Sequence, residues 1–339
     1  MTATSNLSHR TEKFLVTGTA GFIGFHVARR LLDAGLSVIG VDGMTPYYDV
    51  ELKRRRHAIL SESPLFTPHE FMLEENDRLA PLVATEQPEI VIHLAAQAGV
   101  RYSTENPRAY IDSNVVGTFN LLEACRAHMP RHLLIASTSS VYGDSNDVPY
   151  REDSDTSHPV SLYAATKKAV EVMAYSYASL YRIPTTAFRF FTVYGPWGRP
   201  DMALFKFTSA ILEDREIEVY GQGQMSRDFT YIDDLVNGIV GLVDVPPVGE
   251  GAPFREVNIG ASQPVELEAF IAIVERELNR KAKRKYLPMQ LGDVRRTHAD
   301  VARLRSLIDY PTPTTLDVGV RAFVEWYMRE YASQPAKVA

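Results

Sequence analysis

Residues Val16–Gly24 read V-T-G-T-A-G-F-I-G, and this stretch decides the fold. The apolar run Phe14–Thr17 has the length of a short strand, and the residues F-H-V-A-R-R-L-L-D-A that follow the stretch have helical spacing. Three glycines, Gly18, Gly21 and Gly24, join the two. Glycine permits a tight turn, and the free N–H groups at the start of the helix can bind a phosphate. The stretch therefore predicts a strand–loop–helix unit that holds the pyrophosphate of a dinucleotide.

Further apolar runs alternate with helical patterns along the chain after this unit. Ser37–Val41, Glu89–Leu94 and His132–Ala136 have the length of strands and show no polar alternation, whereas Ser113–His128 and Tyr163–Tyr181 have the pattern of helices. Strands that are apolar on both faces belong to a parallel sheet that is covered by helices on each side. The sequence therefore predicts an α/β fold with a doubly wound, Rossmann-type parallel sheet.

The pattern loosens after residue 191, where Pro and Gly become frequent and interrupt the alternation. We expect residues 12–191 to form the domain that binds the dinucleotide, and residues 192–330 to form a smaller region that mainly binds the substrate. Residues 229–260 are expected to return to the sheet of the first domain. Residues 1–11 and 332–339 are expected to be disordered.

The composition excludes several classes of protein. The chain has 339 residues, of which 45% are hydrophobic and 23% are charged, so it is predicted to be globular. A net charge of -6 argues against nucleic acid as the main partner. The single cysteine, Cys125, cannot form an intramolecular disulfide, which fits a reducing compartment. Because the chain also lacks a signal-peptide pattern and a long apolar run, we expect a cytoplasmic protein with no membrane partner.

The second predicted strand ends at Asp42, 18 residues beyond Gly24. A carboxylate at this position can accept hydrogen bonds from an adenosine ribose and would repel a 2′-phosphate, so the residue favours NAD over NADP. The alternative is an aspartate that only caps a turn at the end of the strand. The cluster Arg54–Arg56 could bind a 2′-phosphate, but we interpret it as a solvated helix face.

Tyr163 and Lys167 are four residues apart in a predicted helix, so both project from one face. A tyrosine with a pKa near 10 is a poor base at neutral pH, but a fixed ammonium and a nicotinamide cation would both favour its phenolate and lower that pKa. The run S-T-S-S, residues Ser137–Ser140, ends a predicted strand and could present hydroxyls to the same substrate oxygen. The alternative for these hydroxyls is a turn that caps the strand end.

Five segments together resemble the extended short-chain dehydrogenase/reductase family. They are V-T-G-T-A-G-F-I-G, H-L-A-A-Q-A-G-V-R, S-N-V-V-G-T, S-T-S-S-V-Y-G and Y-A-A-T-K. Within that family, the segments R-F-F-T-V-Y-G-P-W-G-R-P-D-M-A and G-Q-M-S-R-D-F-T-Y-I-D-D are most similar to the enzymes that epimerise UDP-glucuronate at C4. The resemblance covers residues 13–330 and implies a Rossmann fold, an NAD cofactor and a UDP-sugar substrate.

The resemblance also implies roles for individual residues. Tyr163 would be the general base and acid, Lys167 would hold the nicotinamide ribose and tune Tyr163, and Thr138 would share the proton network. Arg227 would bind the diphosphate of UDP, and Asp293 would bind the uridine ribose. The other residues implied for the NAD site, with Asp42 added from the strand-end argument, are Gly18, Gly21, Phe22, Ile23, Gly24, Leu94, Ala95, Ala96 and Asn114.

Some positions distinguish branches of the family. Thr192 stands where many sugar-nucleotide epimerases have Asn and is typical of the uronate branch, and Gln290 replaces an Arg of the UDP-galactose-type enzymes. Both differences favour a uronate substrate. The run Glu74–Asn76 occupies a predicted strand end where the family usually has V-D-L, so the adenine contacts there differ from the family pattern.

The expected reaction is NAD-dependent, metal-free interconversion of UDP-glucuronate and UDP-galacturonate through a 4-keto sugar. Because that ketone is a β-keto acid, the enzyme must hold the carboxylate so that CO2 is not lost. Dehydratases and decarboxylases of the family have an acidic residue in the strand-end motif, and this chain has T-S-S instead, which favours retention of the carboxylate. Hydroxyl and guanidinium groups that could hold it belong to Thr138, Ser139, Ser140, Thr192, Arg101 and Arg199.

Three other functions stay open from the sequence: a UDP-glucuronate decarboxylase, a neutral UDP-hexose 4-epimerase, and a non-catalytic NAD-binding scaffold on the same fold. The helices predicted at Ser113–His128 and Tyr163–Tyr181 carry apolar residues on more than one face. In the resembling family, such helices form a four-helix seam between two subunits. We therefore expect a homodimer.

Overall fold

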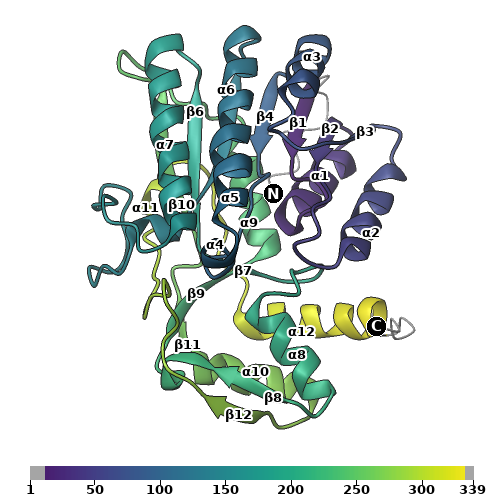
Figure 1. The fold of residues 1–339 in the computed structure, drawn as a ribbon, viewed down its shortest axis with the longest axis vertical. Helices are drawn as coiled ribbons and strands as arrows, with labels where there is room; N and C mark the ends of the chain where they lie inside the picture. The colour runs from purple at the N-terminus through teal and green to yellow at the C-terminus, as the bar shows by residue number, and fades with distance from the viewer. Residues whose placement is uncertain (1–11, 333–339) are drawn as a thin grey trace.

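The structure is a computed structural model that describes residues 12–332. Its main feature is a seven-stranded sheet in which every neighbouring pair of strands is parallel, in the order β10-β6-β5-β4-β1-β2-β3 (Figure 1). The strands are β1 (Lys13–Thr17), β2 (Ser37–Asp42), β3 (Phe66–Glu70), β4 (Ile90–His93), β5 (His132–Thr138), β6 (Thr185–Phe190) and β10 (Phe254–Ile259). The predicted doubly wound parallel sheet is confirmed.

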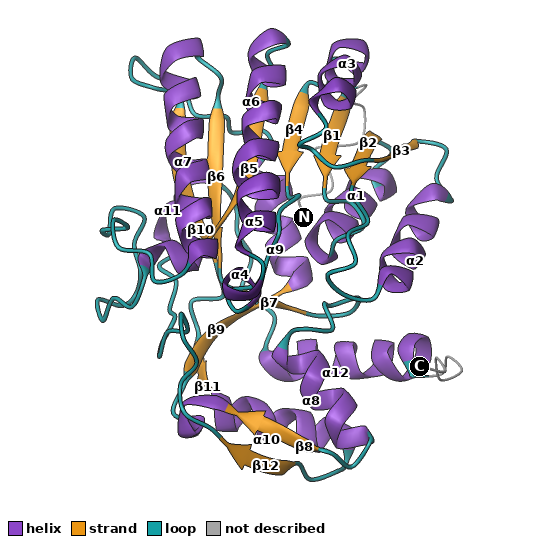
Figure 2. Ribbon diagram, in the orientation of Figure 1, coloured by secondary structure: helices purple, strands orange, loops and turns teal. Residues whose placement is uncertain are grey.

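Helices cover both faces of this sheet (Figure 2). In β1, Phe14 and Val16 are buried with α1, α2 and α9 on one face, whereas Leu15 is buried with α3, α6 and α7 on the other. This arrangement explains why the strand is apolar at successive positions. The helices are α1 (Phe22–Asp33), α2 (Val50–Ser61), α3 (Asn76–Glu86), α6 (Gly117–Ala127), α7 (Leu162–Tyr181) and α9 (Ile232–Leu242).

The strand order reverses between β1 and β4, because the chain runs from β1 outward to β2 and β3 and then crosses back. Ligands of open α/β sheets bind outside the carboxyl ends of the strands at such a point. The loop after β1 begins at Gly18, and the loop after β4 begins at Leu94, so both lie at this edge. The topology therefore places the predicted glycine loop at the expected binding position.

A smaller lobe lies beyond the carboxyl edge of the sheet, at the bottom of Figure 1. It holds a three-stranded sheet in the order β11-β9-β7 and a two-stranded sheet of β8 and β12. Its elements are β7 (Thr192–Tyr194), α8 (Ala203–Leu212), β8 (Glu216–Val219), η4 (Tyr220–Gly223), β9 (Ser226–Tyr231), β11 (Pro264–Glu266), α10 (Leu267–Leu278), β12 (Lys283–Tyr286), α12 (Leu316–Trp326) and η5 (Tyr327–Tyr331). Short elements elsewhere are α4 (Tyr102–Glu105), α5 (Pro107–Tyr110), η2 (Ile111–Val116), η3 (Ser139–Tyr142) and α11 (Ala302–Leu307).

Residues 229–260 return to the large sheet only in part, which corrects the expectation for this segment. β10 pairs with β6, but Phe229–Tyr231 end β9, a strand of the small three-stranded sheet, and Ile232–Leu242 fold as helix α9 against α1. The physical reason lies in Asp233 and Asp234, which occupy the first turn of α9, where carboxylates favour the positive end of the helix dipole. The apolar residues after them are therefore core residues of a helix.

Buried His132 ties the sheet to this helix layer. Its Nε2 lies 2.9 Å from the Thr186 hydroxyl on β6, and its Nδ1 lies 3.1 Å from the Val243 carbonyl oxygen just after α9. Burial lowers the pKa of His132 to about 4, so the ring is neutral at pH 7.

No helix within residues 12–332 is long and apolar enough to cross a membrane. Disorder was predicted for residues 1–11 and 332–339. Apart from Ala332, these residues lie outside the described part of the chain.

Candidate active site

A cavity of about 1320 Å³ opens between the carboxyl edge of the large sheet and the smaller lobe. With one exception, the site residues predicted from the sequence all line it. They are Gly18, Gly21, Phe22, Ile23, Gly24, Asp42, Leu94, Ala95, Ala96, Arg101, Thr138, Ser139, Ser140, Tyr163, Lys167, Thr192, Arg199, Arg227 and Asp293. The exception is Asn114.

The glycine loop leaves no space for side chains at two positions. A Cβ on Gly24 would lie 2.0 Å from the Gly18 carbonyl oxygen, and a Cβ on Gly18, whose φ is +79°, would lie 2.8 Å from the Ala95 nitrogen. This packing brings the start of α1 to the cavity wall, and no described side chain caps that helix at Gly21. Free N–H groups at a helix N-terminus bind phosphate. The loop therefore fits the pyrophosphate of a dinucleotide.

Asp42 caps a turn and also lines the cavity. One carboxylate oxygen accepts a hydrogen bond from the Ala20 N–H at 2.9 Å, and the other accepts one from the Met44 N–H at 2.8 Å. The carboxylate thus caps the turn after β2 and holds the glycine loop. It also lines the cavity, where its remaining lone pairs can accept from ribose hydroxyls.

The threonine at the end of β1 organises the part of the wall that packs against the glycine loop. Thr17 Oγ1 accepts hydrogen bonds from the backbone N–H groups of Leu94 and Ala95, each at 3.1 Å, so it must donate its only proton to His93 Nδ1, 2.8 Å away. His93 Nε2 then carries the ring proton and faces the Thr118 hydroxyl at 2.9 Å. Burial lowers the pKa of His93 to about 3, so the imidazole stays neutral.

Asn114 lies behind the cavity wall, which corrects its expected place in the NAD site. Its side-chain oxygen accepts from the Gln97 N–H at 2.8 Å, and its amide nitrogen donates to the Gln97 carbonyl at 3.1 Å and to the Thr166 hydroxyl at 3.0 Å. Gln97 itself lines the cavity. Asn114 therefore positions the loop after β4 and links it to α7.

Tyr163 and Lys167 lie on one face of α7 and both line the cavity. Burial lowers the pKa of Lys167 to about 8, against the attraction of Glu171. Burial also raises the pKa of Tyr163 above its ordinary value, while a hydrogen bond with the Thr138 hydroxyl lowers it. The expected lowering by the Lys167 ammonium does not occur among these side chains. The physical reason is that burial outweighs the other effects on the phenol.

The strand-end hydroxyls form the turn that was the alternative interpretation, and they also line the cavity. Thr138 Oγ1 accepts from the Ser140 N–H at 3.1 Å and donates to the Ser140 hydroxyl at 3.2 Å. Thr138, Ser139 and Ser140 all reach the cavity, as does Thr192 on β7. The turn therefore fixes a set of hydroxyl groups beside Tyr163 without removing them from the site.

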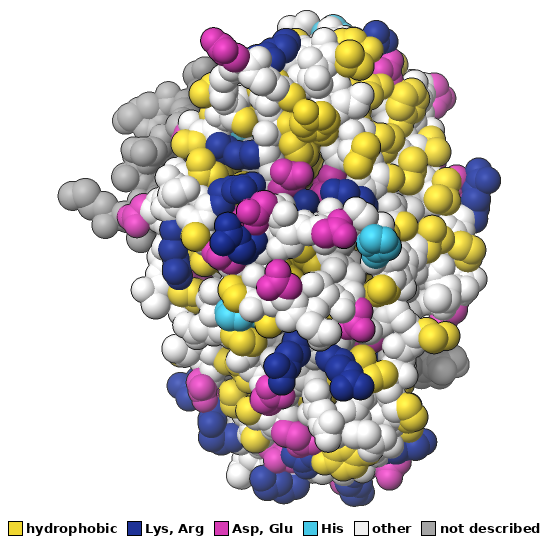
Figure 3. Space-filling view, turned by 90° about the vertical axis from the view of Figure 1, so that its left-hand side faces the viewer, with side chains coloured by type: hydrophobic (Ala, Val, Ile, Leu, Met, Phe, Trp, Pro, Cys, Tyr) yellow, Lys and Arg dark blue, Asp and Glu magenta, His cyan; other side chains and the backbone are white. Residues whose placement is uncertain are grey.

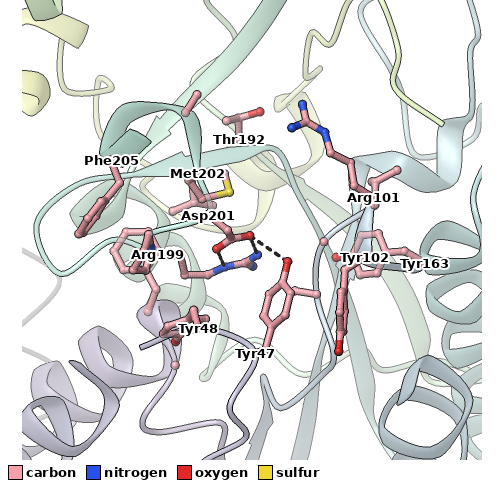
Figure 4. Close-up of a pocket in the computed structure, with 18 of the residues that line it drawn as sticks. Tyr47, Tyr48, Arg101, Tyr102, Tyr163, Thr192, Arg199, Asp201, Met202 and Phe205 are labelled. Atoms are coloured by element: carbon pink, nitrogen blue, oxygen red, sulfur yellow. Dashed lines mark hydrogen bonds and ion pairs between the residues drawn. The ribbon is translucent and has the colours of Figure 1, made fainter. Parts of the chain in front are cut away.

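An ion pair that extends to a tyrosine lines the cavity (Figure 4). Arg199 binds Asp201 through two hydrogen bonds of 2.9 and 2.5 Å, and Asp201 accepts a third from the Tyr47 hydroxyl at 3.1 Å. Burial disfavours both charges, yet each ion stabilises the other, so the pKa of Arg199 lies above its ordinary value and that of Asp201 lies below. The Tyr47 ring packs against Tyr102, with ring centres 4.7 Å apart.

A second ion pair faces the cavity from the smaller lobe. Arg227 on β9 donates to Asp293 at 3.1 Å, and the Arg101 guanidinium lies 3.9 Å from the other oxygen of Asp293. The Arg101 guanidinium also stacks over the Tyr220 ring, 4.7 Å from its centre. The two residues expected to hold UDP are therefore adjacent, with an additional cation beside them.

Three further observations differ from the sequence interpretation. Glu74–Asn76 do not end a strand, because β3 ends at Glu70, and they lead into α3 instead. Arg56 is not solvated, since its side chain is fully buried. Tyr47 and Tyr102 were missed as site residues, although Tyr47 lies in the loop after β2 and Tyr102 begins the short helix α4 after β4, and binding residues gather in such connecting segments. Within residues 12–332, no cluster of three or more His, Cys, Asp or Glu residues could hold a metal ion.

The chain is similar to known proteins over most of its length. Residues 14–260 match the model of the NAD dependent epimerase/dehydratase family. A probable UDP-glucuronate 4-epimerase of Rhizobium meliloti is 55% identical over 333 residues, which cover 94% of this chain and 98% of that protein. UDP-glucuronate 4-epimerase 1 of Arabidopsis thaliana is 43% identical over 343 residues, which cover 97% of this chain and 80% of that protein.

A solved structure gives the same picture. The crystal structure of UDP-glucuronic acid 4-epimerase from Bacillus cereus, in complex with UDP-glucuronic acid and NAD, matches with a TM-score of 0.87 at 32% sequence identity. The match covers 94% of this chain and 100% of that one. The likeness therefore includes both lobes that enclose the cavity.

Proposed function

The chain belongs to the NAD dependent epimerase/dehydratase family, and from this premise we propose that it interconverts UDP-glucuronate and UDP-galacturonate at C4. The observation that carries the proposal is one cavity in which the glycine loop, the Thr138–Tyr163–Lys167 group and the Arg227–Asp293 pair all meet. A dinucleotide and a nucleotide-sugar can therefore reach the same tyrosine from opposite lobes.

The residues of the glycine loop and Asp42 would hold NAD, together with Leu94, Ala95, Ala96 and Lys167. Bound NAD supplies the acceptor, and later the donor, of the hydride at the sugar C4. The Tyr163 phenolate would take the proton of the sugar 4-hydroxyl and return it after the ring has turned. Thr138 would stabilise the phenolate through its hydrogen bond, and the Lys167 ammonium would hold the nicotinamide ribose.

The hydroxyls at the end of β5 support retention of the sugar carboxylate. A ketone at C4 makes the C5 carboxylate a β-keto acid, so the site must keep that carboxylate solvated and out of line with the ketone. Thr138, Ser139, Ser140 and Thr192 present hydroxyl donors to the cavity, and the motif contains no acidic residue. Arg199 would add charge, but only together with its partner Asp201. Such a hydroxyl cradle favours epimerisation over decarboxylation.

Purified protein incubated with UDP-glucuronate, without added NAD, tests the reaction. We expect NMR spectra to show UDP-galacturonate accumulating to a constant ratio, with no CO2 evolved. A UDP-pentose with CO2 would make the protein a decarboxylase, and turnover of UDP-glucose alone would make it a neutral UDP-hexose 4-epimerase. An absence of turnover on every UDP-sugar would favour the scaffold and overturn the proposal.

The exposed apolar faces of η2, α6 and α7 support a second copy of the chain as partner. Phe119 on α6 is 46% exposed and Val172 on α7 is 57% exposed, with Ile111, Val116 and Tyr175 exposed near them along the same elements. α6 packs beside α7, and Figure 3 shows hydrophobic side chains gathered in the upper right of this face. Exposed apolar side chains gathered on neighbouring elements support an interface with a second copy of the chain.

Light scattering after size exclusion tests this dimer. The wild type is expected at twice the mass of one chain, and Val172→Glu at the mass of one chain, because a buried unpaired carboxylate disfavours the interface. Val318→Glu on α12 is the matched control, since Val318 is equally exposed but lies in the smaller lobe. A monomeric wild type would contradict the proposed dimer.

A further inference from the structure

The loop of residues 195–201, here called the arginine loop, carries Arg199 and Asp201 from β7 toward α8. Its backbone is unusual, because Trp197 has a φ of +60° and Gly195 a φ of +144°. A bulky residue in the left-handed region is strained and persists only where its surroundings hold it. The loop ends in the Arg199–Asp201 pair, which the proposed function places at the sugar, and we call this part of the cavity the sugar end. The contacts that hold the arginine loop therefore affect the geometry of the site.

Side chains of α1 and α2, which cover the large sheet, bind three consecutive carbonyl oxygens of the arginine loop. The Pro196 carbonyl accepts from His26 Nε2 at 3.0 Å, and the carbonyls of Trp197 and Gly198 both accept from Arg56 Nη2, at 2.5 and 3.2 Å. Burial lowers the pKa of His26 to about 3, so its neutral ring donates one hydrogen bond here. Arg56 therefore supplies two of the three contacts that hold this backbone.

The other end of the same guanidinium reaches the glycine loop. Arg56 Nη1 donates to the Ala20 carbonyl and to the Tyr48 hydroxyl, each at 2.8 Å. The side chain is fully buried, and none of the ion pairs within residues 12–332 includes it. The two Nη atoms of Arg56 thus donate to carbonyl and phenol oxygens, whereas its buried Nε has no hydrogen-bond partner among the described residues. Binding oxygens on two sides suits the rigid planar fork of arginine and not the single point of a lysine ammonium.

We propose that Arg56 is a positioning residue for the reaction, because it fixes the arginine loop against the glycine loop and so sets where Arg199 and Asp201 stand at the sugar. The proposal rests on the proposed function and extends it. Arg199 lies one residue beyond the second carbonyl that Arg56 binds, so a shift of this backbone moves the Arg199–Asp201 pair. The cluster Arg54–Arg56, which could have indicated NADP, contains instead a buried brace between the two lobes.

Three substitutions in α2 separate this role from a general structural one. Arg56→Lys keeps the charge and loses the fork, Arg56→Met loses both, and Arg54→Met removes an exposed arginine from the same helix as the matched control. Two probes divide the cavity: UDP reports the Arg227–Asp293 end, and UDP-glucuronate also reports the sugar end. Calorimetric titration of proteins that also carry Tyr163→Phe measures both dissociation constants without appreciable turnover, and NMR of the proteins that keep Tyr163 measures kcat and KM.

We expect Arg56→Lys to lower the affinity for UDP-glucuronate roughly tenfold and to lower kcat roughly tenfold or more. The affinity for UDP should stay within about twofold of the wild-type value. Arg54→Met should match the wild type in all four constants. In an Arg199→Met background, Arg56→Lys should add no further loss of UDP-glucuronate affinity, because the two residues act through one another.

Two results would overturn the proposal. One is equal weakening of UDP and UDP-glucuronate in Arg56→Lys, and the other is unchanged binding and turnover in that variant. If Arg56→Met does not fold, Arg56→Lys carries the test alone. Failure of the wild type to turn over UDP-glucuronate would overturn the proposed function instead, because the binding measurements read the arginine loop independently of catalysis.

Discussion

Replacing Lys167 by methionine is expected to stabilise the NAD-free protein while it removes activity. Burial lowers the pKa of Lys167 from 10.5 to about 8, and each pKa unit corresponds to about 1.4 kcal/mol. At pH 7 the buried ammonium therefore costs the folded state about 3 kcal/mol relative to the unfolded chain. Methionine has a similar length and no charge, so the variant should be about 3 kcal/mol more stable. With an unfolding entropy of about 2.1 cal/mol/K per residue, this raises the unfolding midpoint by about 4 °C.

The pH dependence gives the prediction its sign. Between pH 8 and 10.5 the unfolded chain binds a proton that folded Lys167 does not, so the stability of the wild type rises with pH through this window. The advantage of Lys167→Met should therefore be complete below pH 8 and vanish near pH 10.5. Thermal unfolding of both proteins at pH 7 and pH 10, followed by fluorescence after NAD has been removed, measures it.

The neighbouring lysine provides a control of opposite sign. Lys168 is 28% exposed, and its Nζ lies 3.2 Å from a carboxylate oxygen of buried Glu171. Lys168→Met removes a partner of that carboxylate, so this variant should be no more stable than the wild type. The reasoning is refuted if Lys167→Met is less stable than the wild type at pH 7, or if its advantage is the same at pH 7 and pH 10.

Three further substitutions test the rest of the site. Tyr163→Phe should retain NAD but lose roughly 10²–10⁴-fold in kcat, measured by NMR, because the proton acceptor is removed; near-normal turnover would exclude the tyrosine from proton transfer. Asp42→Ala should lose NAD on dialysis, as the ratio of absorbance at 260 and 280 nm shows, because two loop N–H groups lose their acceptor; full retention would contradict this. Gly24→Ala places a Cβ 2.0 Å from the Gly18 carbonyl oxygen, so both the unfolding midpoint and NAD content should fall, and an unchanged midpoint would mean that the loop can shift.

The sheet could be predicted from the sequence because its strands have a recognisable local pattern. A run such as H-L-L-I-A in β5 is apolar at successive positions, and only burial on both faces accounts for that. The glycine loop was equally readable, since its three glycines stand between a strand and a helix. α9 also has a local signal in Asp233 and Asp234, but the apolar residues of this segment led us to expect a return to the sheet.

The remaining site features depend on contacts between distant segments. Arg56 lies in a helix rich in charge, and such residues are usually solvated. Its burial depends on the carbonyls of Trp197 and Gly198, more than a hundred residues away, which no local pattern announces. Asn114 was placed in the right region, but only the structure shows that its amide faces Gln97 rather than the cavity. Motifs therefore located the site, while tertiary contacts decided which residues support it.

The three buried neutral histidines are expected to lower the stability of the fold in acid. The pKa values of His26 and His93 are about 3 and that of His132 is about 4, whereas each ring in the unfolded chain titrates near 6.5. Below pH 6.5 these three histidines bind protons in the unfolded chain but not in the folded one. Their combined effect lowers the free energy of unfolding by roughly 4 kcal/mol for every pH unit between about pH 6 and pH 4. A moderate decrease in pH should consequently weaken both the cavity wall at His93 and the contact between the lobes at His26.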